Sequence, residues 1–393
     1  MSIDSPRVLI AGVSTRAVVE SAVRAGFDVT SVDAYADIDQ PAAARCLSLP
    51  RDFGRPWHAA RAARATASER VDAVLYTSNI ENHPRAVAAL SNGRELWGNA
   101  PDTLRRARHP ELVRDAFRAA GIPAPDAFVN AADERLRAVV RSGSAGGSWI
   151  LKPVRSGGGQ GVRTWRDGRV PRSHYVQAFV EGWPGSVVFV AARGRAAVLG
   201  VTRQIVGDPT FGAAGFRYCG SLLCAPGRDD AWWSRQATRL AGVAAKAFGL
   251  VGVGGVDFIA GRDVVHPIEV NPRWTASLEL VERARGISVF GMHADACRHG
   301  VLPAVDASGS AGSRVYGKAI VFARHDATAG DTRPWLRDDS VRDVPPPGTR
   351  IAAGQPVCTV FAADADADAC YAALVHRAQL VYGQLMKWNQ EAA

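Results

Sequence analysis

The segment SWILKPVRSGGGQGVRTW, residues 148–165, places one lysine between an apolar run and a cluster of glycines. Lysine is scarce, because only four of the 47 Lys and Arg residues are lysines. Lysine is a compact, mobile charge that can follow a phosphate, and glycines let backbone N–H groups approach phosphate oxygens closely. WILKPV predicts a strand that fixes the direction of Lys152, and residues 156–161 form a loop after it. Since the lysine precedes the glycines, the ordinary P-loop pattern is excluded and another phosphate site is indicated.

A second segment, VDFIAGRDVVHPIEVNPR (residues 256–273), indicates a metal site. It predicts two adjacent strands joined by a Gly-Arg-Asp turn, with Asp257 on the first strand and Glu269 and Asn271 on the second. The period of two places Glu269 and Asn271 on one face, and Asp257 can share it. Burying lone carboxylates is unfavourable, whereas two carboxylates and an amide suit Mg²⁺. Arg273 extends the same face and can neutralise charge on a transferred phosphoryl group.

The remaining patterns place these two segments in a chain of several parts. RVLIAGV, a helical stretch ending at Gly26, and FDVTSVDAY form a βαβ unit, and VDAVLYTS is a further buried strand. We expect an α/β and α+β protein with four parts: an α/β domain over 1–100, a helical connection and small lobe over 101–185, a central domain with the metal site over 186–302, and a β-rich segment over 303–393 packed on the central domain. A long helix is expected at about 231–249, a small-residue linker at 303–313 and a last helix at 367–388.

Composition narrows the class of protein. A chain of 393 residues with 47% hydrophobic and 22% charged residues suits two or three globular domains. Its net charge of +9 is spread along the chain without interleaved aromatics, which favours a small anionic ligand such as a nucleotide over nucleic acid. The six cysteines form no CxxC pair, and the sequence has neither a signal peptide nor a run of about 20 apolar residues. We therefore expect a cytoplasmic protein without a membrane partner.

Together and in this order, the segments resemble the ATP-grasp superfamily of carboxylate–amine and carboxylate–thiol ligases. The resemblance implies the ATP-grasp fold, with an N-terminal Rossmann-like preATP domain, a lid lobe carrying the glycine loop and a central ATP-grasp domain. It implies that Lys152 holds the α- and β-phosphates and that YVQAFVEGWPGSVVF (175–189) contacts the adenine. The residues implied for ATP are Lys152, Gly157, Gly158, Gly159, Gly161, Gln177, Phe179, Val180 and Glu181. Those implied for Mg²⁺, or Mn²⁺ in its place, are Asp257, Glu269 and Asn271, and those implied for catalysis are Lys152 and Arg273.

This sequence departs from the family pattern at two places. Many members have a second lysine before the lid, where this chain reads RARHPELVRD (106–115), so Arg108 either replaces it or the phosphate contact is absent. The carboxylate that usually follows the hinge falls near Pro184 and Gly185, which leaves the ribose contact open. Four segments also resemble a branch of predicted ATP-dependent carboligases: GWPGSVVF, the stretch from TRQIVG to CGSL, NPRWTASLEL and PPPGTRIAAGQPVCTV. That branch includes a tyramine–glutamate ligase of methanofuran assembly and relatives in methylotrophic bacteria.

The reaction implied by the resemblance joins a small carboxylic acid and an amine. The acid attacks the γ-phosphate of ATP to give an acylphosphate and ADP, and the amine then displaces phosphate to form an amide. Glutamate as acid or acceptor, one-carbon cofactor (methanofuran- or methylofuran-like) biosynthesis and a homodimer are implied with it. Side chains considered for substrate selection are Arg203, Arg217, Tyr218, Trp274, Ser277 and Glu279.

Three alternatives stay open at this point. One is a biotin-carboxylase-like enzyme that uses bicarbonate, and another is an ATP-binding protein without turnover. The third is a nicotinamide oxidoreductase, which rests on the N-terminal βαβ unit alone. GVSTR after the first strand lacks the GxGxxG fingerprint, which counts against the third.

Overall fold

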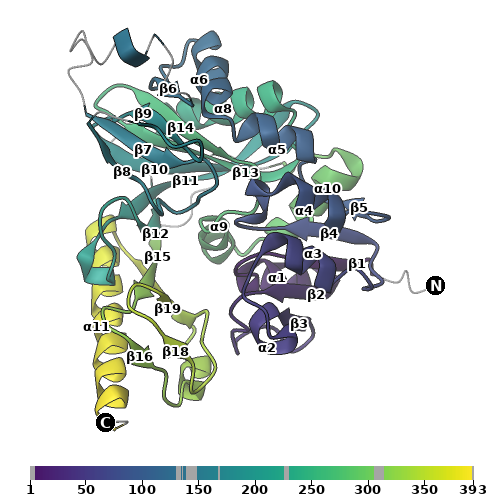
Figure 1. Ribbon diagram of the computed structural model, residues 1–393, viewed down its shortest axis with the longest axis vertical. Coiled ribbons are helices and arrows are strands. Elements are labelled where there is room, and N and C mark those ends of the chain that lie inside the picture. Colours follow the sequence, from purple (N-terminus) through teal and green to yellow (C-terminus); the bar gives the residue numbers. More distant parts are fainter. Residues whose placement is uncertain are drawn as a thin grey trace.

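The structure is a computed structural model that describes residues 5–129, 134, 136–138, 148–166, 169–224, 230–304 and 314–391. Figure 1 shows the N-terminal domain (purple to blue) beside the central sheets, which lie at the top of the view. The C-terminal segment (green to yellow) extends below the central sheets, and helix α11 runs along its outer side. Among the described residues, none of the helices combines the length and the hydrophobicity needed to cross a lipid bilayer.

The N-terminal domain is a parallel five-stranded sheet with the order β3-β2-β1-β4-β5. This confirms the predicted α/β architecture, in which nearly continuous apolar strands are covered by helices on both faces. The strands are β1 Arg7–Ala11, β2 Asp28–Asp33, β3 Arg45–Ser48, β4 Ala73–Tyr76 and β5 Glu95–Leu96. The helices are α1 Arg16–Arg24, α2 Leu49–Phe53, α3 Ala59–Ala65 and α4 Pro84–Leu90, with the 3-10 turn η1 Ile80–Asn82 before α4.

Two helices lead from this domain to a small antiparallel sheet that forms the lid lobe. The helices are α5 Pro101–Ala107 and α6 Pro110–Ala119, each with a proline in its first turn, where its missing N–H costs no hydrogen bond. The lid sheet has the order β6-β9-β7-β8, and its core includes Trp149, Leu151 and Val176. Its strands are β6 Ala127–Phe128, β7 Trp149–Pro153, β8 Arg163–Trp165 and β9 His174–Ala178.

The central and C-terminal parts share one antiparallel sheet of eight strands, in the order β14-β13-β10-β11-β12-β15-β19-β17. The strands are β10 Trp183–Ala192, β11 Arg195–Val206, β12 Tyr218–Leu223, β13 Gly252–Ala260, β14 Val265–Asn271, β15 Val315–Phe322, β17 Val341–Arg342 and β19 Pro356–Asp364. A separate two-stranded sheet pairs β16 Ala327–Thr328 with β18 Arg350–Ile351. The helical pieces are α8 Asp230–Phe248, α9 Leu278–Arg285, α10 Val289–His299 and α11 Ala367–Glu391, with η2 Pro209–Phe211 and η3 Arg333–Arg337.

The long helices fall where the sequence places them, at 230–248 and 367–391. Helix α8 packs against the central sheet through its alanine-rich face, which includes Ala237, Ala241 and Ala245. The linker expected at 303–313 lies largely outside the described residues.

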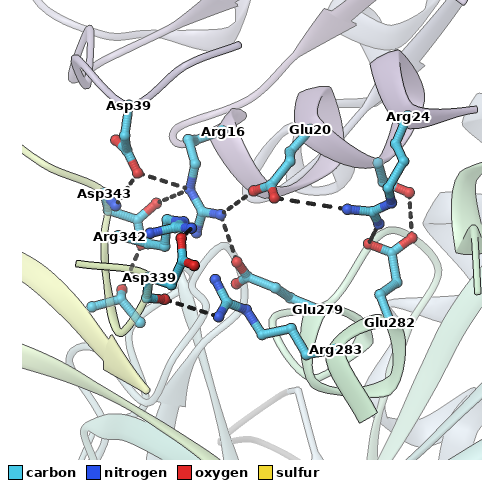
Figure 2. A network of polar contacts seen from close by, with 12 residues as sticks. Arg16, Glu20, Arg24, Asp39, Glu279, Glu282, Arg283, Asp339, Arg342 and Asp343 are labelled. Atoms are coloured by element: carbon cyan, nitrogen blue, oxygen red, sulfur yellow. Dashed lines mark hydrogen bonds and ion pairs between the residues drawn. The ribbon is translucent and has the colours of Figure 1, made fainter. Parts of the chain in front are cut away.

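A buried ion-pair network joins the N-terminal domain, α9 and the C-terminal segment (Figure 2). Arg16 of α1, whose side chain is 1% exposed, lies 2.5 Å from Glu279 of α9, 3.0 Å from Asp343 after β17 and 3.6 Å from Asp39 after β2. Lys318 of β15 contacts the other oxygen of Glu279 at 2.7 Å. The network therefore fixes how three parts of the chain meet. Its member Glu279 lies soon after the predicted metal ligands in the sequence.

Candidate functional site

A cavity of about 250 Å³ lies between the lid sheet and the central sheet. Its walls come from β7, β9 and the glycine loop on the lid side, and from β10, β13, β14 and the segment that follows β14 on the central side. Residues more than a hundred positions apart in sequence thus face the same space. The predicted site residues that line it are Lys152, Gly157, Gly158, Gly159, Gln177, Phe179, Val180, Tyr218, Asp257, Glu269, Asn271, Arg273 and Ser277.

Lys152 stands on β7 with its ammonium group buried in this cavity. Its Nζ donates to Gln177 Oε1 at 3.3 Å on the neighbouring β9, lies 3.9 Å from Glu269 Oε2 and sits 5.6 Å from the centre of the Tyr175 ring. Burial by itself would lower the pKa of Lys152, but Tyr175 and Glu269 outweigh it, so the pKa is raised. The lysine is therefore a permanent positive charge between the lid and the predicted metal ligands.

The glycine loop packs against the segment that leads into β12. Gly158 and Gly159 have φ angles of +60° and +71°, which side chains rarely adopt. The Gly158 carbonyl accepts the Tyr218 N–H at 3.0 Å. A Cβ at Gly159 would lie 1.7 Å from the Phe216 carbonyl oxygen, so only glycine fits this approach. The loop is thus held over the mouth of the cavity by backbone contacts.

The three predicted metal ligands lie together on adjacent strands. Asp257 of β13 is opposite Glu269 of β14 in the register, and Asn271 Nδ2 donates to Asp257 Oδ2 at 2.8 Å. Gln204 Nε2 of β11 donates to the other Asp257 oxygen at 3.0 Å. Burial, and then the charge of Glu269, raise the pKa of Asp257. A divalent cation near both carboxylates would favour their ionised forms.

Arg108 lies at the junction of α5 and α6 and reaches the predicted metal ligands. Its guanidinium donates to Glu269 Oε1, to the Val270 carbonyl at 3.2 Å, to Asn82 Oδ1 at 3.2 Å and to the Ser156 carbonyl at 3.1 Å. Although burial by itself would raise the pKa of Glu269, the charges of Arg108 and Lys152 outweigh it and lower that pKa. The arginine considered as a replacement for the missing lysine therefore lines the cavity and contacts the glycine-loop backbone.

Arg273 is oriented by a residue that sequence reasoning missed. Its Nε donates to Glu81 Oε1 at 2.6 Å, its NH2 group lies 3.3 Å from Asn271 Oδ1, and its NH1 group donates to the Trp274 carbonyl at 2.9 Å. Glu81 lies in η1, just past the carboxyl end of β4, and its side chain is fully buried. Since ligands of open α/β sheets gather at the carboxyl ends of strands, the position of Glu81 after VLYTS is the signal that could have found it.

Six residues considered for ATP or substrate do not line the cavity: Gly161, Glu181, Arg203, Arg217, Trp274 and Glu279. Arg203 stacks 5.6 Å from the Trp183 ring and Arg217 stacks 3.8 Å from the Phe322 ring, so the two arginines do not converge on one carboxylate. Trp274 is buried in an apolar cluster.

Ser277 and Tyr218 do face the cavity, within a group of hydroxyls. The Tyr218 hydroxyl lies 2.9 Å from Ser221 Oγ, and Ser277 Oγ lies 3.5 Å from Ser221 Oγ and 3.3 Å from Thr202 Oγ1. Thr275 also lines the cavity, and its buried hydroxyl has no hydrogen-bond partner among the described residues. Glu279 is committed to Arg16 and Lys318 and belongs to the ion-pair network instead.

The residues present fit a magnesium nucleotide. Two carboxylates and the Asn271 amide oxygen are hard donors of the kind that Mg²⁺ accepts, and they are few enough to leave positions for phosphate oxygens. The described residues contain no group of three or more His, Cys, Asp or Glu side chains placed to hold a metal by themselves. Such a site would be completed by the nucleotide's own phosphates.

Comparison with known proteins identifies the fold. Residues 112–277 match the family model described as the ATP-grasp domain. The chain has the ATP-grasp fold. No curated protein sequence is significantly similar to it.

Solved ATP-grasp structures superpose along nearly the whole chain at low identity. A biotin carboxylase from Campylobacter jejuni, in complex with β-γ-ATP, has a TM-score of 0.69 at 16% identity and covers 93% of this chain and 89% of its own. An L-amino acid ligase from Bacillus licheniformis has a TM-score of 0.66 at 17% identity, covering 95% and 97%. N5-carboxyaminoimidazole ribonucleotide synthetase from Thermus thermophilus has a TM-score of 0.67 at 17% identity, covering 96% and 98%.

Proposed function

We propose that the chain is an ATP-dependent, ADP-forming ligase that joins a carboxylic acid to an amine through an acylphosphate. The observation that carries the proposal is the convergence of Lys152, the glycine loop and the set Asp257, Glu269 and Asn271 on one cavity. A positive charge, the backbone N–H donors of the glycine loop and hard oxygen ligands around a single space match the triphosphate end of MgATP.

Each wall of the cavity would hold a different part of the nucleotide. The strand β9 and the residues after it, Gln177 to Val180, would meet the adenine with backbone groups and an amide. Lys152 and the glycine-loop amides would hold the phosphates, while Asp257, Glu269 and Asn271 would hold Mg²⁺. When bound, the metal would neutralise phosphate charge and align the oxygens for transfer.

The chain's own residues would then position and stabilise the reacting groups. Arg273, held by Glu81 and beside Asn271, would place its charge next to the transferred phosphoryl group. The glycine loop would exclude water, because an acylphosphate hydrolyses when water reaches it. The hydroxyls of Thr275 and Ser277 would contact the acid, since they lie on the segment that follows Arg273 and face the cavity.

The narrower substrate proposal rests on the sequence resemblance to the carboligase branch. Within that branch, glutamate and an aryl amine such as tyramine are the first pair to test, with a role in one-carbon cofactor biosynthesis. A homodimer is proposed with it, and the biotin carboxylase domain of a 2-oxoglutarate carboxylase from Hydrogenobacter thermophilus, of the same fold, is a dimer in complex with MgADP.

The test measures ADP release over a matrix of amino acids and amines, with product amides identified by mass spectrometry. Lys152→Ala and Glu269→Gln should each reduce ADP formation by about 100-fold or more, because each removes a charge beside the triphosphate. Lys246→Ala is the matched control, since Lys246 is exposed on α8. Unchanged turnover in both site variants would overturn the site. Phosphate release that needs bicarbonate and no amine would instead support the carboxylase alternative, and nucleotide binding without turnover would support a non-catalytic ATP-binding protein.

A further inference from the structure

A second cavity, of about 810 Å³, opens beside the first cavity, which is the proposed nucleotide pocket. It lies between the first turn of α6, the loop from β4 to α4 and the segment that follows β7. Arg108, Pro110 and Val154 line both cavities, so a wall only a few side chains thick separates them. The proposed reaction makes no use of this second space.

Basic side chains dominate its walls. Besides Arg108, three arginines and three histidines line the cavity: His58, His83, Arg85, Arg105, His109 and Arg155. The acidic residue among the described lining is Glu81, whose side chain is fully buried and pairs with Arg273 at 2.6 Å. The open part of the cavity therefore presents positive charge.

Several of these groups have no partner within the part of the chain that the structure describes. Arg85 and Arg155 are exposed, and neither guanidinium makes a hydrogen bond or ion pair with another described residue. The Nδ1 atom of His109 is buried and also lacks a partner among the described residues. Burial, and then the nearby charges of His58 and Arg155, lower the pKa of His83, as expected where positive charges crowd together.

The start of α6 borders the cavity through His109 and Pro110. His109 is the N-cap of this ten-residue helix, and its side chain makes no capping hydrogen bond. The positive end of the helix dipole favours an anion nearby, although the Glu111 carboxylate in the same turn offsets part of this field. Helix end, unpaired arginines and an unpaired histidine nitrogen thus surround one space.

We propose that this second cavity is an oxyanion-binding site, separate from the nucleotide pocket, that takes a small molecule with carboxylate or phosphate groups. The anion is either a carboxylate metabolite or inorganic phosphate, taken up from solution. It would lie against the face of the wall formed by Arg108, whose guanidinium also contacts the Ser156 carbonyl of the glycine loop at 3.1 Å. The site goes beyond the proposed ligase activity and does not rest on it.

Isothermal titration calorimetry of the nucleotide-free full chain tests the proposal, with citrate and inorganic phosphate as separate probes. Each guanidinium supplies charge-assisted hydrogen bonds, so the double variant Arg85→Gln/Arg155→Gln should bind the preferred probe at least about tenfold more weakly. The matched control is Arg195→Gln/Arg235→Gln, which removes the same charge from exposed positions away from the cavity and should bind as the unchanged protein does.

The two probes distinguish the sources. Tighter binding of citrate indicates a carboxylate metabolite, and tighter binding of phosphate indicates the inorganic ion. The proposal is overturned if neither probe binds at millimolar concentration, or if both double variants lose the same affinity, which would mean a general effect of net charge. ADP release is measured in a separate assay, and Arg85 and Arg155 do not line the first cavity. Failure of the anion-binding test therefore leaves the proposed ligase activity standing, and the reverse also holds.

Discussion

Replacing Arg16 by methionine should destabilise the whole chain, because it strips a buried cluster of carboxylates of its shared cation. The side chain of Arg16 is 1% exposed and lies within 3.6 Å of Glu279, Asp343 and Asp39. Removing one partner of a buried ion pair typically costs about 3–5 kcal/mol, since the opposite charge is left uncompensated. Methionine keeps most of the side-chain volume, so the loss would report on charge and hydrogen bonds rather than on a cavity.

The measurement is the free energy of unfolding from urea titration, with Arg7→Met as the matched control. Arg7 pairs with Asp72 on the surface, where both side chains are about half exposed (51% and 52%), and such pairs contribute about 0–1 kcal/mol.

An acid titration gives the second arm of this experiment. Although burial by itself would raise the pKa of Glu279, Arg16 and Lys318 hold it well below its usual range. This contribution to stability is present above the ordinary carboxyl pKa and is lost as the pH falls below it. The difference in free energy of unfolding between the unchanged protein and Arg16→Met should therefore become smaller as the pH is lowered. The reasoning would be refuted if Arg16→Met lowered the free energy of unfolding no more than Arg7→Met does. It would also be refuted if the difference from the unchanged protein were the same at every pH.

Two further predictions concern the glycine loop and a buried histidine. Gly159→Ala should slow ADP release and raise the KM for ATP with little change in thermal stability, because its Cβ would lie 1.7 Å from the Phe216 carbonyl oxygen and displace the loop. Gly157→Ala is the control, since there is open space around its Cβ. Equal kinetics in the two variants would contradict the proposed packing of the loop against Phe216. Burial lowers the pKa of His293 from 6.5 to about 4, because the buried ring favours its neutral form. The neutral ring carries no penalty above pH 6.5, whereas between pH 6.5 and 4 the unfolded chain gains a proton that the folded chain excludes. The free energy of unfolding should therefore fall by about 3 kcal/mol over that interval. His293→Gln should flatten this part of the stability curve measured by urea titration, and an unchanged slope would assign the acid sensitivity to other groups.

The layout of the fold could be predicted from local patterns. Apolar strands such as RVLIA and AVLY are buried in the N-terminal sheet, as their continuous hydrophobicity indicates. The alternation around Glu269 and Asn271 also gave their shared face, because the strand period is fixed by the backbone itself. These signals are carried by a few neighbouring residues, so no tertiary information was needed.

The remaining features depend on contacts between distant segments, which no local pattern encodes. The pairing of Glu81 with Arg273 depends on how the N-terminal sheet meets β14. Arg203 and Arg217 were considered for a carboxylate because of their charge, yet the structure places each against an aromatic ring. The choice between solvent, ring and ligand is made by tertiary packing, so arginine alone predicts none of them.

The continuity of the eight-stranded sheet has a consequence for how the chain is made. Strand β12 lies between β11 and β15, and at Gly220 the two backbones approach so closely that a Cβ would lie 2.4 Å from the Lys318 carbonyl oxygen. Until the ribosome has released β15, one side of β12 presents unpaired N–H and C=O groups, a template on which other nascent chains can add. A fragment that ends before residue 315 would keep the lid and the candidate metal ligands, but its β12 would remain an unpaired edge strand. Anyone trimming the protein for crystallisation should therefore retain its final 80 or so residues.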